Sequence, residues 1–202
     1  MTSWDSLQTE TRAAQAHPWH GVSPLVEDGS HLVYIENTPL TVMKYEIDPD
    51  TGLLKVDYPL ATSALPPSAY GFVPRTLCGS KVAQLNLRLR GDRAALDVFV
   101  LSERPLEVPG VLANVRIIGG IPVQDEAYVD DKLIAVLLRD ASFGHLEDIG
   151  DAPVYAIDRI CHFLVQSSLQ GSALIGDPFG AERAERLLAA ALDDYAQKFG
   201  SD

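Results

Sequence analysis

Residues 111–138 read VLANVRIIGGIPVQDEAYVDDKLIAVLL. The apolar runs from Val111 to Ile118 and from Lys132 to Leu138 are typical of strands that are buried on both faces. Gly119-Gly120 ends the first of these runs. Leu96 to Leu101 has the same apolar character. We therefore expect these three segments to be core strands.

Shorter strand signals precede this central stretch. Leu32 to Ile35 is a short apolar run, and Thr41 to Ile47 alternates well enough to form a second strand. Residues 48–52 read DPDTG, which is a turn signal, so Leu53 to Val56 should complete a hairpin.

The helix signals come late in the chain. Residues 64–70 are rich in Pro and Ser and should be irregular, whereas the alternation in Gly79 to Arg90 predicts an exposed strand or hairpin arm. Pro153 to Leu169 carries a helical stripe of apolar residues, and Ala181 to Phe199 is a second, Ala/Leu-rich helix. Strands first and helices last favour an α+β, mainly β class: a closed barrel flanked by C-terminal helices.

Length and composition suit one globular domain. The chain has 202 residues, of which 47% are hydrophobic, enough to bury a sizeable core. Residues 1–20 are polar and should form an N-terminal arm of a single domain that spans 1–202. This arm lacks the basic start and apolar centre of a secretory signal, and no apolar run is long enough for a membrane span.

The charge balance limits the classes of partner. There are 28 acidic and 16 basic residues, giving a formal charge of -12. We expect neither nucleic acid nor an anionic membrane as a partner, because both need a basic surface. A small anionic phosphate compound fits only if bound cations attract it. Cys78 and Cys161 have no metal-ligand spacing and are expected to be reduced thiols of a cytoplasmic protein.

Acidic residues gather near the ends of the expected strands. Asp92 and Asp97 are five positions apart, and so are Asp125 and Asp130. An odd offset places side chains on opposite faces of a regular strand, so each pair converges only across a turn or loop. Converging carboxylates suit hard cations such as Mg²⁺. The alternative is a solvated acidic rim. The other acidic residues with such positions are Glu36, Glu46, Asp57 and Asp131.

Two lysines stand beside these acids in apolar strands. Lys44 lies in MKYE and Lys132 in DDKLIAV. A Lys in such a place either ends in a salt bridge or points into a site where it meets an anion, unless it lies on the surface.

Four ordered blocks of the sequence carry a resemblance. They are HPWHG near the start, KYEIDPDTGLLKVD, YGFVPRTLC, and PLEVPGVLANVRIIGG followed by DEAYVDDKLIAV. Together they resemble the family I soluble inorganic pyrophosphatases over roughly residues 17–168, with the first and third blocks close to the plant-type branch. The resemblance implies an OB-like five-stranded closed barrel with helices on its outside. It also implies hydrolysis of inorganic pyrophosphate with several Mg²⁺ ions, and a homo-oligomer.

Carried over position by position, the resemblance implies a set of site residues. Asp92, Asp97, Asp125 and Asp130 would be metal ligands, with Glu36 as a further metal-linked acid. Asp92, Asp97 and Tyr70 would be catalytic. Lys44, Glu46, Tyr70 and Lys132 would bind substrate, with Asp57 in the wall of the site.

The chain departs from the family pattern at several positions. Ala94 stands where the family has the middle Asp of its aspartate motif, which orients the attacking water. Tyr58 replaces an Arg, and Ser167-Ser168 replaces a Tyr-Lys pair. These groups belong, by resemblance, to the reaction water and to the grip on one phosphate.

About twelve extra residues precede the altered motif, and Arg75, Arg88, Arg90 and Arg93 are candidates for replacement cations. Three interpretations stay open: a slowed pyrophosphatase, a metal-dependent phosphohydrolase of altered specificity, and an inactive homologue that binds metal or phosphate.

Overall fold

The structure is a computed structural model that describes residues 16–60, 65–85, 90–125, 128–167 and 173–200. Most of the expected N-terminal arm, Arg88 and Ser168 lie outside these residues. The described strands are β1 (His31–Asn37), β2 (Met43–Ile47), β3 (Leu54–Pro59), β4 (Ala69–Phe72), β5 (Arg90–Gly91), β6 (Asp97–Leu101), β7 (Val111–Ile121), β8 (Val123–Asp125), β9 (Tyr128–Val129), β10 (Lys132–Leu137), β11 (Leu174–Ile175) and β12 (Phe179–Gly180). The helices are α1 (Ser80–Leu85), the 3-10 helix η2 (Ile149–Asp151), α2 (Val154–Ser167) and α3 (Ala181–Phe199).

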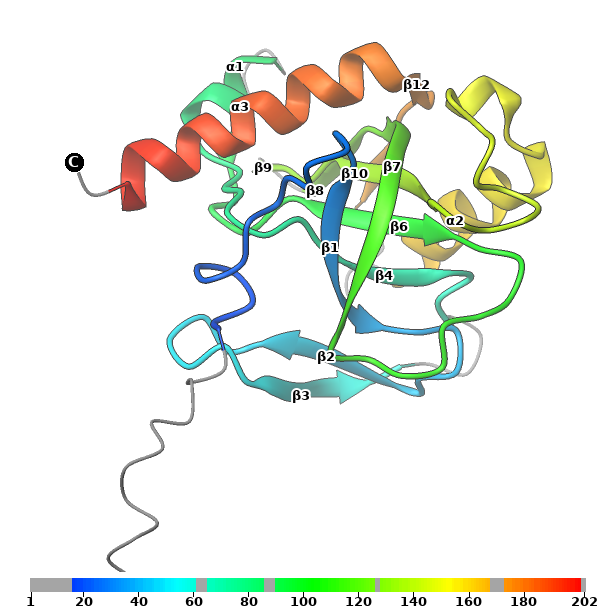
Figure 1. The fold of residues 1–202 in the computed structure, drawn as a ribbon, viewed down its shortest axis with the longest axis horizontal. Coiled ribbons are helices and arrows are strands. Elements are labelled where there is room, and N and C mark those ends of the chain that lie inside the picture. Colours follow the sequence, from blue (N-terminus) through cyan, green and yellow to red (C-terminus); the bar gives the residue numbers. More distant parts are fainter. Residues whose placement is uncertain (1–15, 61–64, 86–89, 126–127, 168–172, 201–202) are drawn as a thin grey trace, which may run out of the picture.

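Five strands close into a barrel, as the sequence predicts. Their order is β1-β4-β6-β10-β7, and β1 also pairs with β7, so the sheet returns on itself. All of these pairs are antiparallel except β6 and β10, which run parallel. The β2–β3 hairpin, also predicted, lies at the end of the barrel opposite α3 (Figure 1).

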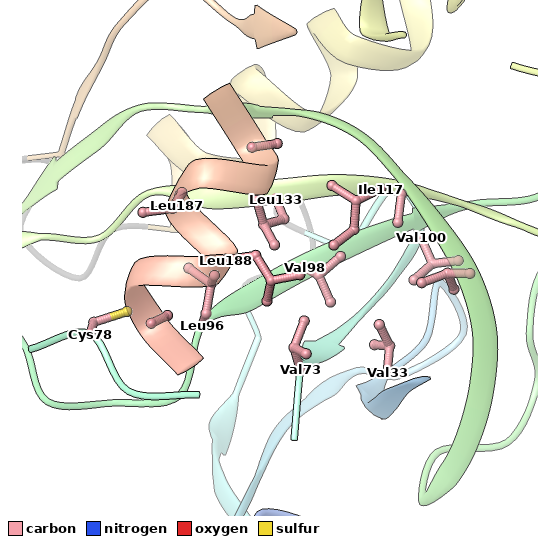
Figure 2. Packing of buried hydrophobic residues seen from close by; sticks show 14 of the residues in the cluster. Val33, Val73, Cys78, Leu96, Val98, Val100, Ile117, Leu133, Leu187 and Leu188 are labelled. Carbon is pink, nitrogen blue, oxygen red and sulfur yellow. The ribbon is translucent and has the colours of Figure 1, made fainter. Parts of the chain in front are cut away.

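β6 and β10 are buried on both faces, which explains their uninterrupted apolar sequence. β7 was expected to be buried in the same way, but Val111 and Leu112 at its start are exposed. Its continuously buried part, residues 117–121, runs through the Gly-Gly pair that was expected to end the strand. In β6, Val98 and Val100 belong to the core cluster that includes residues of α3, whereas Phe99 and Leu101 belong to the cluster under α2. β10 divides in the same way. Figure 2 shows Leu187 and Leu188 of α3 packed over the first cluster.

The prediction of a strand over Gly79 to Arg90 was wrong. Within the described residues, this stretch holds the helix α1 and only the two-residue strand β5. The buried carboxylate of Asp194, on α3, accepts hydrogen bonds from the backbone N–H groups of Gly79, Lys81 and Val82. These contacts satisfy N–H groups that the first turn of a helix leaves unpaired. A partner more than a hundred residues away overrides the local alternation.

The Pro- and Ser-rich stretch is also more regular than predicted. Its last two residues, Ala69 and Tyr70, begin β4, because they pair with Val100 and Phe99 of β6. This pairing fixes the position of the Tyr70 side chain.

A buried aromatic residue, Trp19, attaches the segment before β1 to the rest of the fold. Trp19 packs against His20 and Phe199, and its indole N–H donates to the carbonyl of Thr76 at 2.8 Å. No helix in the described part of the chain is long and apolar enough to cross a membrane.

Candidate active site

The site begins where two parallel strands begin. Asp97 is the first residue of β6 and Lys132 the first of β10, and Leu133 pairs with Val98 in the register of the two strands. Parallel neighbours start at the same edge of a sheet, so these two side chains meet there.

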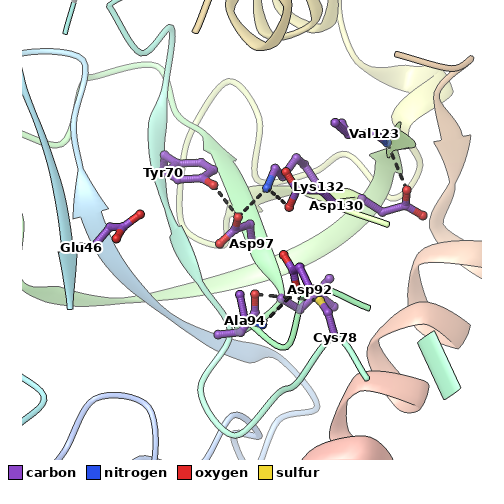
Figure 3. Close-up of polar contacts among 12 residues, drawn as sticks. Glu46, Tyr70, Cys78, Asp92, Ala94, Asp97, Val123, Asp130 and Lys132 are labelled. Carbon is purple, nitrogen blue, oxygen red and sulfur yellow. Dashed lines mark hydrogen bonds and ion pairs between the residues drawn. The ribbon is translucent and has the colours of Figure 1, made fainter. Parts of the chain in front are cut away.

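Four side chains share one network of polar contacts. The Tyr70 hydroxyl donates to Oδ2 of Asp97 at 2.5 Å, and the Lys132 ammonium donates to the same oxygen at 2.6 Å. Lys132 also donates to Oδ1 of Asp130. Figure 3 shows these groups pointing toward one another. The Lys132 side chain is only 6% exposed, so two carboxylates surround a nearly buried cation.

The environment fixes the protonation of the network. Burial raises the pKa of Tyr70 well above its usual value, and the negative charge of Asp97 adds to this, so Tyr70 remains a hydrogen-bond donor. Burial alone would lower the pKa of Lys132. The charges of Asp130 and Asp97 outweigh burial and hold the Lys132 pKa well above its usual value.

The β2–β3 hairpin supplies a second cation. Lys44 pairs with Glu46 and lies 3.5 Å from Oδ2 of Asp57. Burial would lower the pKa of Lys44, but the hydrogen bond and the charge of Glu46 raise it overall. Tyr58, opposite Lys44 in the hairpin register, has its ring centroid 5.6 Å from the ammonium nitrogen.

Two further carboxyls are more basic than usual. Burial raises the pKa of Glu36 to about 8, with help from the charges of Asp97 and Glu46, although Glu36 accepts a hydrogen bond from the Ile47 N–H. Burial and the charges of Asp130 and Asp97 raise the pKa of Asp92 to about 6. Perturbed carboxyls of this kind gather at functional sites.

One cavity of about 750 Å³ brings these groups together. The residues from the sequence-predicted set that line it are Glu36, Lys44, Glu46, Tyr70, Asp92, Asp97, Asp130 and Lys132. Asp57 contacts Lys44, and the side chain of Asp125 lies outside the described part of the structure. Trp19 and Lys55 also line the cavity and were not predicted. The sequence did contain a signal for Lys55, because it is a lone cation between the apolar residues Leu54 and Val56 of β3.

The oxygen ligands that the cavity offers are of the chemical type that a hard divalent cation prefers. Asp92, Asp97 and Asp130 offer carboxylate oxygens on one cavity, which are the ligands that Mg²⁺ prefers. Among the described residues, however, no three His, Cys, Asp or Glu side chains are gathered closely enough to hold an ion. Instead, Lys132 occupies the space between Asp97 and Asp130.

Comparison with known proteins places the chain among relatives of the same architecture. The family model described as inorganic pyrophosphatase matches residues 33–196. The chain belongs to the inorganic pyrophosphatase family. A relative from Chlamydia trachomatis named inorganic pyrophosphatase is 35% identical over 207 residues, covering 95% of this chain and 99% of the relative. Soluble inorganic pyrophosphatase 1 of Arabidopsis thaliana is 32% identical over 191 residues, covering 92% of this chain and 83% of that relative.

Solved pyrophosphatases share the fold. The crystal structure of inorganic pyrophosphatase from Thermus thermophilus superposes with a TM-score of 0.76 at 29% sequence identity, covering 89% of this chain and 99% of that one. The five-stranded barrel is therefore the fold of a solved inorganic pyrophosphatase.

Proposed function

We propose that the protein hydrolyses inorganic pyrophosphate to two phosphates, with Mg²⁺ as its metal ion. The observation that carries this proposal is the buried network in which Asp97 joins Tyr70 and Lys132 at the wall of a cavity. The names of the family and its relatives support the substrate. Their activity as pyrophosphatases supports a divalent cation, and the all-carboxylate donor set favours Mg²⁺ among such cations.

The reaction itself is a simple exchange at phosphorus. A water oxygen forms a bond to one phosphorus, the bond from that phosphorus to the bridging oxygen breaks, and the bridging oxygen leaves with the second phosphate. The proton of the attacking water passes to a nearby base or to solvent. Such a reaction depends mainly on positioning and on charge neutralisation.

Residues of this chain supply both the positioning and part of the charge neutralisation. Lys132 stays cationic at neutral pH and is held by hydrogen bonds to Asp97 and Asp130, so its third N–H is left to donate to one phosphate once bound cations offset the two carboxylates. Tyr70 keeps its proton and adds a hydroxyl beside it. Lys44 faces the same cavity from the hairpin. Bound divalent cations would neutralise further substrate charge and lower the pKa of the attacking water.

Three substitutions relative to the family pattern lie on the cavity wall. Ala94, Tyr58 and Ser167 all line it, and none of them carries a charge at neutral pH. Loss of a group that orients or deprotonates the nucleophile costs about 10²–10⁴-fold in rate. We therefore expect turnover to be slower than in a pyrophosphatase with the full set.

A phosphate-release assay tests the proposal. Purified protein with Mg²⁺ should release phosphate from pyrophosphate, and a chelator should stop the release. A panel of phosphate esters runs in parallel. Release from an ester but not from pyrophosphate would replace the proposal with a phosphohydrolase of other specificity. No release from any compound, with Mg²⁺ binding still detected by calorimetry, would leave only a metal-binding homologue.

A single substitution tests the assignment of the site residues. Asp130→Asn removes the charge that Lys132 contacts and one carboxylate of the expected metal set, so metal-dependent activity should disappear. Asp50→Asn, in the exposed turn of the hairpin, is the control and should keep full activity. Full activity in Asp130→Asn would refute the assignment.

We also propose that the protein acts as a homo-oligomer in the cytoplasm. Large apolar side chains on and near the β2–β3 hairpin support an interface, since Val42, Leu53 and Val56 are all more than half exposed. Size-exclusion chromatography with light-scattering detection measures the mass of the protein in solution. A monomer mass at micromolar concentration would contradict the oligomer.

A further inference from the structure

The most buried cation of the cavity is already neutralised. The ammonium of Lys132 pairs with Asp97 and Asp130, so two negative charges meet its single positive charge. An incoming polyanion therefore gains little net attraction from Lys132 unless metal ions shield the carboxylates.

The other lysines of the cavity are paired as well. Lys44 contacts Glu46 and lies 3.5 Å from Asp57. Lys55 lies 3.8 Å from Asp48. Both lysines line the cavity, and each one already faces at least one carboxylate.

Arg93 is different. It lines the same cavity and its side chain is exposed, yet no carboxylate of the described residues lies within 4 Å of its guanidinium. A guanidinium stays protonated at any pH of interest. It also presents a fork of N–H donors that matches two oxygens of a phosphate.

The backbone holds Arg93 firmly in this place. Its N–H donates to the carbonyl of Cys78 at 3.0 Å, and the N–H of Cys78 donates to the carbonyl of Ala94 at 2.8 Å. A Cβ at Gly91 would lie 2.1 Å from the Cys78 carbonyl oxygen, so glycine allows this close approach. The anchored loop fixes where the Arg93 side chain emerges.

Arg93 adopts a left-handed backbone conformation, with a φ of 67°. This region is unfavourable for residues other than glycine, and such strain is concentrated at functional sites. Arg75 is the other described non-glycine residue with positive φ, at 53°, but its Nε donates to the carbonyl of His20 at 3.2 Å. Arg75 has a structural contact, whereas the Arg93 guanidinium has no ion pair with the described residues and belongs to a residue that lines the cavity.

We infer that Arg93 binds the phosphate of the substrate that Lys132 and Tyr70 do not contact. This inference rests on the proposed function, since it takes pyrophosphate as the ligand. A diphosphate carries a second phosphate, which needs a positive charge in a cavity where Tyr58, Ala94 and Ser167 supply none. Arg93 thus adds affinity for compounds with two linked phosphates over those with one.

Binding of a diphosphate that resists hydrolysis tests the inference without requiring turnover. Imidodiphosphate with Mg²⁺ is titrated into the full-length protein in a calorimeter. Arg93→Gly removes the guanidinium and relieves the left-handed backbone, so the fold should survive. We expect its dissociation constant to rise about 10- to 100-fold, the range for one charged hydrogen-bonding group. Arg93→Lys should lie in between, because it keeps the charge without the fork.

Arg75→Gly is the matched control. It also removes an arginine from a left-handed position, but one outside the cavity lining, so its dissociation constant should stay within twofold of the parent value. Equal binding by the parent and by Arg93→Gly would overturn the inference. Equal losses in Arg93→Gly and Arg75→Gly would overturn it too, because they would indicate a general effect on the fold.

Turnover separates this inference from the proposed function. With pyrophosphate as substrate, Arg93→Gly should raise KM more than it lowers kcat. If the parent binds imidodiphosphate through Arg93 but never hydrolyses pyrophosphate, the proposed function fails and the inference stands. If the parent hydrolyses pyrophosphate and Arg93→Gly leaves KM and the analogue's affinity unchanged, the inference fails alone.

Discussion

Oδ2 of Asp97 lies 2.6 Å from Nζ of Lys132, at the point where the parallel strands β6 and β10 begin. The pairing of these strands brings together two residues that are 35 positions apart in the sequence. With Asp130 on its other side, the ammonium occupies a place between two carboxylates. In the absence of metal, Lys132 therefore stabilises the site, and in its presence the same carboxylates are candidate ligands.

Replacing Lys132 with Met should destabilise the metal-free protein. Without the ammonium, Asp97 and Asp130 face each other with no cation between them. Breaking a buried pair costs about 3–5 kcal/mol. Because both carboxylates remain partly exposed, we expect about 1–3 kcal/mol here. Unfolding by urea in the presence of a chelator measures the difference, and Mg²⁺ should stabilise the variant more than the parent protein.

Lys81→Met is the control for this prediction. Lys81 pairs with Asp193 at 2.9 Å, but both side chains are well exposed, so its loss should cost no more than about 1 kcal/mol. A Lys132→Met protein as stable as the parent without metal would contradict the role that we give to the ammonium.

Asp194→Ala should destabilise the protein through α1. The Asp194 carboxylate receives backbone N–H groups of Gly79, Lys81 and Val82, and its removal leaves them without this partner. The loss of a cap costs about 0.5–2 kcal/mol, and the buried position puts this case at the upper end. Thermal unfolding should show a midpoint lower by about 4–8 °C.

The neighbouring acid provides the comparison. Asp193 is exposed and pairs only with the Lys81 side chain among the described residues, so Asp193→Ala should change the midpoint little. Equal effects of the two substitutions would show that the Asp194 contacts do not stabilise α1.

The barrel could be predicted from sequence because each of its central strands carries its own signal. β6 and β10 are apolar at consecutive positions, and the structure places alternate side chains in two different clusters. α3 also carries its own signal, a helical stripe of apolar residues that includes Leu187 and Leu188 and packs on one core cluster. Burial on a defined face leaves a periodicity that can be read locally.

α1 could not be predicted in this way. Its segment alternates like a strand, and what makes it helical is a carboxylate on α3. Local pattern contains no information about a partner so far along the chain. The start of β4 at Ala69 depends in the same way on pairing with β6.

The candidate site was predictable as a set of residues but not as a geometry. Residue types and positions made Asp97, Asp130 and Lys132 candidates, and the family resemblance assigned them to one site. All three line one cavity of the structure. The direct pairing of Lys132 with both carboxylates follows only from the strand register. Among the described residues no carboxylate pairs with the Arg93 guanidinium, and this too follows from the fold and not from the local sequence.

His31 should make stability depend on pH in the mildly acidic range. Burial lowers the pKa of His31 below 6.5, although the charge of Glu185 opposes this shift. Between the folded pKa and 6.5, the unfolded chain binds more protons than the folded protein does. The free energy of unfolding therefore falls as pH drops through this window, and the contribution is absent above pH 6.5.

His31→Gln should reduce this pH dependence. Urea unfolding at pH 7.5 and pH 5.5, with chelator present, measures the change in the free energy of unfolding between the two conditions. His162→Gln, at an exposed position of α2, is the control and should leave that change as it is. An unchanged difference in the His31 variant would exclude His31 as its source.

Ala94→Asp should accelerate the hydrolysis of pyrophosphate. Ala94 lines the cavity on the loop before β6, and the family pattern has at this position an Asp that orients the attacking water. Its N–H donates to Oδ1 of Asp92 at 2.9 Å, so the loop already holds the backbone in place. A group of this kind contributes about 10²–10⁴-fold to a rate, and we expect at least about a tenfold gain in kcat for one introduced without its evolved surroundings. Ala94→Asn has nearly the same shape without the charge and should bring no such gain. If Ala94→Asp folds normally and its kcat stays at the parent value, the attacking water is oriented by some other group and the assignment of this loop to the nucleophile is wrong.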